Sequence, residues 1–166
     1  ITLPPAVEML SPGAFDAWQT ATQIEVSQEN PFFRSVDGVL FSADGRRLVR
    51  YPQGRTDKKY VVPDGVVEIG PRAFFECNAL KEVVLPQSLR RIESYAFDAC
   101  LSSVSLPASL ETLSPQAFIC DLSKIDLSPA NPFFRLIDGV LFSADGRTLV
   151  LYPQGRTDKK YVVPNG

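Results

Sequence analysis

An internal duplication constrains the fold of this chain more than any other feature of its sequence. Segment Asn30–Gly65 reads NPFFRSVDGVLFSADGRRLVRYPQGRTDKKYVVPDG, and segment Asn131–Gly166 repeats it with 31 identities in 36 positions. The copies differ at five pairs of positions, namely Ser35/Leu136, Val36/Ile137, Arg47/Thr148, Arg50/Leu151 and Asp64/Asn165. A duplication of this kind predicts that both copies share one backbone fold and that the chain is assembled from stacked units.

A shorter repeat runs between and around the two copies. Four units carry an apolar-Pro pair, and an Ala-Phe pair follows each proline at a constant offset, giving Ala14-Phe15, Ala73-Phe74, Ala96-Phe97 and Ala117-Phe118. Before three of the later prolines the pattern is L-x-x-L-x-L, as in Leu80-x-x-Val83-x-Leu85. A period of about 20–29 residues with this pattern is the signature of leucine-rich repeats, which place one short strand in each coil.

Stacked coils would align equivalent side chains in ladders. We expect Phe15, Phe74, Phe97 and Phe118 to form one continuous buried ladder, and a single helical turn nearby, for instance at Pro115–Cys120. In the duplicated segment, Gly38–Ser42 and Arg46–Tyr51 predict a β-hairpin around Ala43-Asp44-Gly45. The second copy predicts the same hairpin from Gly139–Ser143 and Arg147–Tyr152. About 13 extra residues are expected to protrude there, before Tyr60–Pro63 returns to the strand position of the repeat.

These motifs resemble a known family. The string LP-x-x-L-x-x-I-x-x-x-AF-x-x-C-x-x-L-x-x-V-x-LP, which runs from Val62-Pro63 through Leu106-Pro107 and on to Leu127, is similar to BspA-like (Treponema pallidum-type) leucine-rich repeats. The NPFF block is similar to an insert in such repeats. The resemblance implies a leucine-rich-repeat solenoid, a β-rich stack of parallel strands with short helical turns and two β-hairpin inserts. It also implies a secreted or cell-surface bacterial protein used for adhesion or protein interaction.

The expected organisation is one domain over residues 1–166, with inserts at 30–59 and 131–160, cut from a longer repeat protein. The second copy stops after Tyr161–Pro164, where the first continues into the next coil. An uncovered solenoid end exposes core positions and unpaired strand groups, so we expect further repeats or caps, end-to-end self-association, or a poorly ordered last strand. No signal peptide pattern is present, so a targeting signal is expected to lie elsewhere.

Composition argues against catalysis, cofactors and nucleic acids. Histidine is absent, and 17 basic against 19 acidic residues leave a net charge of −2. The chain therefore lacks the commonest general base, the commonest metal ligand and the basic excess of nucleic-acid binders. We predict no catalytic residue, no metal site, no cofactor and no membrane insertion, since no apolar run approaches the ~20 residues that a membrane span requires.

The three cysteines share one repeat position. Cys77 and Cys100 lie 14 residues beyond their prolines, and Cys120 lies 13 beyond its own. We expect buried, reduced thiols, with a Cys77–Cys100 disulfide as the alternative. Asp37 and Asp44 flank turn glycines, which indicates turn formation rather than calcium binding. The basic run at 55–59, repeated at 156–160, is interpreted as a solvated turn, with an anion-binding patch as the alternative.

The outward positions of the stacked strands form the predicted binding face. Its residues are Gln23, Glu25, Lys59, Val61, Glu82, Val84, Ser103, Ser105, Lys124 and Asp126. The set is polar and mixed in charge, and the exposed aromatic residues are expected elsewhere, at Trp18, Tyr51 and Tyr152. The sequence thus predicts a non-catalytic module that binds a protein or glycan, or alternatively a structural spacer that holds another domain away from the cell surface.

Overall fold

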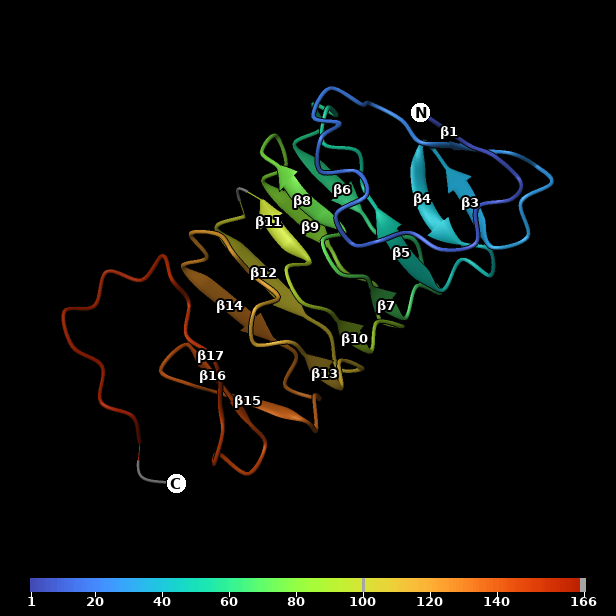
Figure 1. Cartoon of the computed structure of the whole chain (residues 1–166). Helices are drawn as coiled ribbons and strands as arrows, with labels where there is room; N and C mark the ends of the chain where they lie inside the picture. The colour runs from blue at the N-terminus through green and yellow to red at the C-terminus, as the bar shows by residue number, and fades with distance from the viewer. Residues whose placement is uncertain (100, 165–166) are drawn as a thin grey trace.

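The computed structural model describes residues 1–99 and 101–164. Its strands follow a coiled path from one end of an elongated stack to the other (Figure 1). The strands are β1 (Thr2–Leu3), β2 (Glu25–Val26), β3 (Phe33–Val36), β4 (Val39–Ser42), β5 (Arg47–Arg50), β6 (Lys59–Val61), β7 (Glu68–Ile69), β8 (Phe74–Cys77), β9 (Glu82–Val84), β10 (Arg91–Ile92), β11 (Phe97–Ala99), β12 (Ser103–Leu106), β13 (Thr112–Leu113), β14 (Lys124–Leu127), β15 (Phe134–Ile137), β16 (Val140–Ser143) and β17 (Leu149–Leu151).

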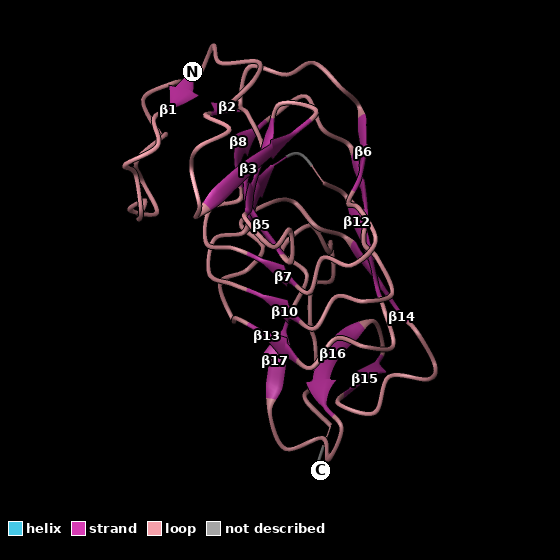
Figure 2. Cartoon of the chain, turned by 90° about the vertical axis from the view of Figure 1, so that its right-hand side faces the viewer, coloured by secondary structure: helices cyan, strands magenta, loops and turns pink. Residues whose placement is uncertain are grey.

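Each regular coil passes through three rows of parallel strands. The first row contains β6, β9, β12 and β14, the second contains β7, β10 and β13, and the third contains β8 and β11. Figure 2 shows the first and second rows on different sides of the stack. Equivalent residues pair in register, for example Val104 with Ile125 and Ile92 with Leu113. This arrangement confirms the leucine-rich-repeat solenoid.

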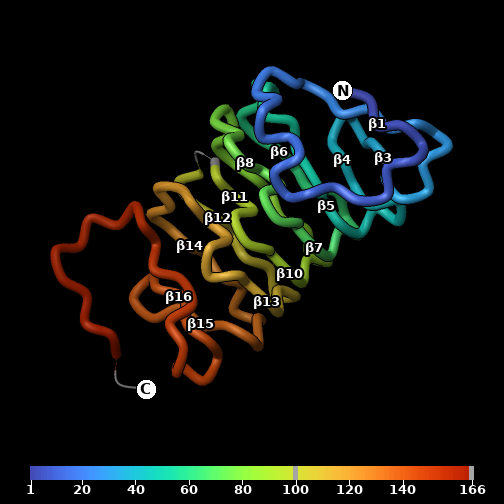
Figure 3. The backbone as a smooth tube through the Cα atoms, in the orientation of Figure 1, coloured from blue at the N-terminus to red at the C-terminus, as the bar shows by residue number. Residues whose placement is uncertain are grey.

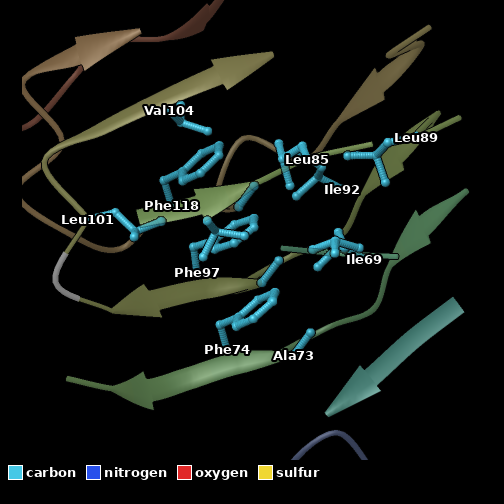
Figure 4. Packing of buried hydrophobic residues seen from close by; sticks show 14 of the residues in the cluster. Ile69, Ala73, Phe74, Leu85, Leu89, Ile92, Phe97, Leu101, Val104 and Phe118 are labelled. Carbon is cyan, nitrogen blue, oxygen red and sulfur yellow. The ribbon is translucent and has the colours of Figure 1, made fainter. Parts of the chain in front are cut away.

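The core contains the predicted phenylalanine ladder, except that Tyr51 and not Phe15 lies next to Phe74. Figure 4 shows Phe74, Phe97 and Phe118 stacked on one another. Their ring centroids are 5.0 Å apart at each step. Tyr51 extends this ladder beside Phe74, at 5.4 Å. Phe15 is also buried, but it belongs to a separate cluster with Leu3, Ile24 and Leu40. The predicted single ladder is therefore wrong at its first member, because the inserted coil places Tyr51 next to Phe74.

No helix is found in the described part of the chain, so the predicted helical turns are not confirmed. At Arg72, Glu76 and Tyr95 the φ angles are 56°, 53° and 58°, a left-handed conformation that interrupts a right-handed helix. The backbone bonds run between coils instead. The Phe97 amide donates to the Ala117 carbonyl at 2.8 Å, and the Ile119 amide donates to the Phe97 carbonyl at 2.8 Å. The segment predicted as a helical turn at Pro115–Cys120 therefore forms backbone hydrogen bonds with the neighbouring coil, besides one local bond from the Ala117 amide to the Ser114 carbonyl.

The insert is a three-stranded antiparallel meander. Strands β4 and β5 confirm the predicted hairpin, and β3 precedes them as a strand that the sequence interpretation missed. Asp37 and Gly38 join β3 to β4 with φ angles of 49° and 76°, which is the geometry of a tight hairpin turn. The insert does not simply protrude, because β5 pairs in parallel with β7 and so continues the second row.

Both copies of the insert adopt this meander. Strands β15, β16 and β17 repeat β3, β4 and β5, and the register of the first hairpin is the same, with Phe33 opposite Ser42 and Phe134 opposite Ser143. The copies lie at opposite ends of the regular coils (Figure 1). This agreement confirms that 31 of 36 identical residues specify one local fold.

The agreement ends after the meander. Lys59–Val61 forms β6 and pairs with β9 of the following coil, whereas the identical residues 160–162 form no strand. Figure 3 shows this part of the second copy as a wide loop beyond β17. Stacking against a neighbouring coil, and not the local sequence, therefore decides whether this segment becomes a strand.

Candidate functional site

The first row brings most of the predicted binding face together. Its pairs place Lys59 beside Glu82 and Val61 beside Val84 on β6 and β9, while β12 and β14 place Ser103 beside Lys124 and Ser105 beside Asp126. The intervening residues point inward, so that Val83 and Val104 are buried. Because side chains alternate along a strand, the eight outward residues share one exposed surface, which we call the first-row face.

Charges on the first-row face are paired with one another. Lys59 Nζ lies 2.7 Å from Glu82 Oε1, and Lys124 Nζ lies 2.9 Å from Asp126 Oδ2. All four side chains are more than half exposed, so water screens both pairs and each contributes about 0–1 kcal/mol to stability. The pairs nevertheless leave the face without a net charge.

A groove of about 540 Å³ crosses β9, β12 and β14 on this face. The apolar side chain of Val84 is 37% exposed there, and nearby Val61 is 57% exposed. The outward polar residues that line the groove are Glu82, Gln87, Ser103, Ser105, Asp126 and Ser128. The groove therefore offers hydroxyl, amide and carboxylate groups around a small apolar surface.

Gln23 and Glu25 do not belong to the first-row face, although the sequence placed them on it. Strand β2 pairs with β1, and the β3–β4 hairpin occupies its other side. The Ile24 amide donates to the Gly38 carbonyl at 2.8 Å, and the Ser35 hydroxyl donates to the Ile24 carbonyl at 2.6 Å. The insert thus fills the place beside β2 that the next first-row strand would otherwise take.

Arg55 of the predicted basic cluster is bound within the protein. Its Nε donates to Asp57 Oδ2 at 2.6 Å, its Nη1 donates to the Asp37 carbonyl at 2.6 Å, and its guanidinium lies 5.2 Å from the centre of the Tyr51 ring. Arg156 makes the equivalent contacts with Asp158 and Asp138 in the second copy. These arginines connect the insert to the following turn by hydrogen bonds, so they are not free to form an anion-binding patch.

Aspartates in the insert stabilise its turns. Asp44 Oδ1 accepts hydrogen bonds from the Ser42 hydroxyl at 2.7 Å and from the Arg46 amide at 3.0 Å, and these bonds lower the pKa of the Asp44 carboxyl below its usual value. The described residues contain no group of three or more His, Cys, Asp or Glu side chains that could hold a metal ion. Turn formation is the role that the contacts of Asp44 support.

The cysteine prediction is confirmed for Cys77. This residue is a reduced thiol with 2% exposure, and burial raises its pKa to about 12. A buried protonated thiol is a poor nucleophile. Cys120 is half-buried, and Cys100 lies outside the described residues.

Two residues of structural importance were missed by the sequence interpretation. Asn30 donates from Nδ2 to the carbonyls of Pro4 and Val7, at 2.9 and 3.1 Å, and accepts at Oδ1 from the amides of Phe32 and Phe33. Asn131 repeats this pattern in the second copy. Each asparagine uses all four of its hydrogen-bonding positions to anchor an insert to the preceding coil.

The exposed aromatic residues differ from those predicted. Trp18 is 45% exposed, as expected, but Tyr51 is 1% exposed and Tyr152 is half-buried. Phe32 and Phe133 are exposed instead, at 42% and 43%. The duplicated NPFF motif is the signal that could have identified them, because Asn fixes the backbone of a phenylalanine that the meander leaves outside.

No helix within the described residues has the length and apolar character that crossing a membrane requires. No curated protein sequence matches the chain significantly.

Similar solved structures come from bacterial proteins, two of which are described as leucine-rich. A leucine-rich repeat protein from Eubacterium ventriosum superposes with a TM-score of 0.69 and 18% identity, over 76% of this chain and 35% of its own. The pneumococcal vaccine antigen PcpA gives a TM-score of 0.55 and 27% identity, and the match covers 79% of this chain and 39% of that protein. A leucine-rich cell surface protein from Faecalibacterium prausnitzii gives a TM-score of 0.52 and 22% identity, and the match covers 75% of this chain and 40% of that protein. The chain thus spans less than half the length of each.

The family model described as the BspA type leucine rich repeat region matches residues 56–143 in six copies. This range covers the regular coils and most of the second meander, and it accounts for more than half of the chain. Both the repeat pattern and the three rows of short parallel strands agree with that match. The chain therefore belongs to the BspA-type leucine-rich repeat family.

Proposed function

We propose that this chain is a non-catalytic protein-interaction module that works as an adhesion surface of a secreted or cell-surface bacterial protein. The groove on the first-row face carries the proposal, because it is a hollow surface held by paired strands of the solenoid. Solenoid proteins use extended surfaces of this kind for binding. Membership of the family and the likeness to a bacterial cell surface protein support the location.

The lining of the groove defines the kind of partner. Val84 supplies apolar contact area, and Ser103 and Ser105 supply hydroxyl groups. The two carboxylates of the lining, Glu82 and Asp126, each pair with a lysine of the first-row face that lies beside the groove. These properties fit an extended protein segment that carries an apolar side chain and little net charge. We therefore expect the affinity to change less than about threefold when the ionic strength rises from about 0.05 to about 0.5 M.

Binding to immobilised extracellular matrix proteins, measured by surface plasmon resonance, tests the proposal. Ser105→Arg places a long charged side chain in the groove and should weaken binding at least about tenfold. Thr112→Arg is the matched control, since Thr112 is an exposed residue of the same coil on the second row. Absence of binding to every matrix protein, or an equal loss in both variants, would contradict the proposal and favour a structural spacer.

A further inference from the structure

Gln23 and Glu25, which the insert separates from the first-row face, line a second surface of their own. A groove of about 610 Å³ lies between β2 and the first meander. A hollow of about 510 Å³ beside Trp18 shares Gln23 with it. Gln23 therefore stands at the boundary between a polar groove and an aromatic surface, and the volume is in the range of sites that bind small ligands.

The groove is rich in polar side chains. Gln23, Glu25, Gln28 and Arg34 line it. Within residues 1–99 and 101–164 the side chains of Gln23, Glu25 and Gln28 form no hydrogen bond or ion pair, whereas the Arg34 guanidinium lies against Gly45 and attracts the Asp44 carboxylate. Amide, carboxylate and guanidinium groups are planar and carry several donors or acceptors each. They can consequently bind a ligand that presents many hydroxyl groups.

Trp18 provides an aromatic surface at the other side of Gln23. Its ring is 45% exposed and packs at 60° against the buried Phe15 ring, with centroids 5.5 Å apart. Its amide donates to the Phe15 carbonyl at 3.0 Å, and its carbonyl accepts from the Ala21 amide at 3.1 Å. These bonds hold the backbone at Trp18, and the packing against Phe15 restricts the ring itself, which lowers the entropic cost of using the ring as a binding platform.

A pyranose ring matches both halves of this surface, because one face presents C–H groups and the rim presents hydroxyls. The two carboxylates of Glu25 and Asp37 outnumber the guanidinium of Arg34 in the groove, and this balance disfavours anionic sugars. We propose that this surface, which we call the Trp18–Gln23 site, binds a neutral oligosaccharide. Its sugar rings stack on Trp18 and its hydroxyls bond to Gln23, Gln28 and Glu25.

The second copy of the insert serves as a natural control. In the second copy, Lys124 replaces Gln23, Pro129 replaces Gln28 and Leu136 replaces Ser35. The loop from Phe118 to Leu122 is shorter than the equivalent loop from Phe15 to Ala21, and it contains no tryptophan. The second meander thus keeps the backbone of the first while losing the amides and the aromatic ring. We expect sugar binding at the first copy only.

Trp18 is the only tryptophan of the chain, so its fluorescence reports on this site alone. The experiment titrates the 166-residue chain with cellotriose, maltotriose and N,N′,N″-triacetylchitotriose, and follows both fluorescence and backbone amide resonances. At least one of these neutral sugars should change the emission of Trp18 and shift the amides of Gln23 and Glu25. Gln23→Ala keeps the Cβ and should weaken binding about tenfold, and Gln28→Ala should weaken it several-fold.

Lys124→Ala is the matched control and should leave the sugar affinity unchanged. Ser105→Arg should also leave it unchanged, which separates this site from the groove on the first-row face. The proposal is overturned if none of the three sugars changes the emission of Trp18, or if the shifted amides lie on β9, β12 and β14. It is also overturned if only a sulfated heparin trisaccharide binds, or if a protein ligand and not a sugar occupies the site.

Discussion

At the scale of single residues, the inserts are held by side chains that satisfy backbone groups. Asn30 joins the first insert to the turn after Pro4, and Arg55 joins the β3–β4 turn to the chain that leaves the insert. Neither residue contributes much apolar area. Each fixes the position of the insert, and the equivalent residues of the second copy make the same contacts.

Asn30→Ala should reduce the free energy of unfolding by roughly 2–4 kcal/mol, because two carbonyls and two amides lose their partner. Asn30→Asp should cost less, since an aspartate can still accept from the amides of Phe32 and Phe33. Urea unfolding followed by circular dichroism measures both effects. Gln28→Ala, a change at an exposed neighbour, should stay within about 0.5 kcal/mol of the wild type; an equal loss there would refute the role of Asn30.

Asp57 makes the stability of the insert depend on pH. The Tyr51 hydroxyl donates to Asp57 at 2.7 Å, and this bond, followed by the bond from Arg55, holds the pKa of Asp57 below its usual value of 3.8. A lowered folded-state pKa gives stability that is present above pH 3.8 and is lost as the pH falls through the folded-state value. Tyr51→Phe removes the main donor.

We therefore expect Tyr51→Phe to raise the pKa of Asp57 toward 3.8, as measured by a carboxyl carbon NMR titration. The difference in unfolding free energy between the wild type and Asp57→Asn should be constant near neutral pH and shrink in acid. A difference that grows as the pH is lowered would show that the carboxylate is not the stabilising form.

At the scale of elements, the context of neighbouring coils decides how nearly identical segments behave. Arg50 in β5 is buried, donates to the Arg72 carbonyl at 2.7 Å and lies 3.4 Å from Asp16. In the second copy the corresponding residue is Leu151, and Ile119 follows Phe118 where Asp16 follows Phe15. In the first copy Arg50 therefore faces the oppositely charged Asp16, whereas in the second copy both equivalent residues are apolar.

The aromatic ladder should behave as one energetic unit. Phe97→Ala removes a ring that stacks on both sides and should cost about 3–5 kcal/mol. In a double-mutant cycle with Phe74→Ala the two losses should not add, because the rings touch each other. Phe15→Ala provides the comparison: its ring belongs to the other cluster, so its loss should add to that of Phe97→Ala within about 0.5 kcal/mol.

The sequence predicts the elements that depend on periodicity, and it fails where an insert competes with that periodicity. Ladder positions such as Val104 and Ile125 follow from the repeat alone, since every coil contributes the same residue. Gln23 was misplaced because its repeat position is shared with Lys59, and only the folded insert shows that β3 and β4 stand between them. Strand β3 could have been recognised, because the Asp-Gly pair at 37–38 marks a two-residue hairpin turn.

At the scale of the whole molecule, regular coils are bounded by two meanders, and protection against hydrogen exchange should reflect this order. Tyr60 on β6 pairs with the following coil, whereas Tyr161 of the second copy lies in no strand. By NMR-detected exchange, the amides of β6 should exchange at least about a hundredfold more slowly than those of residues 160–162. Equal rates for these identical tripeptides would show that local sequence, and not stacking, governs their order.

The placement of the two meanders also bears on how such a gene can change. Both copies begin at the same anchoring asparagine and share one backbone path, so a crossover between their coding segments joins the start of one to the end of the other. The recombinant protein gains or loses every coil between the copies in one event, while its hybrid meander keeps the shared backbone path. The number of coils between the meanders can thereby change in whole blocks rather than residue by residue.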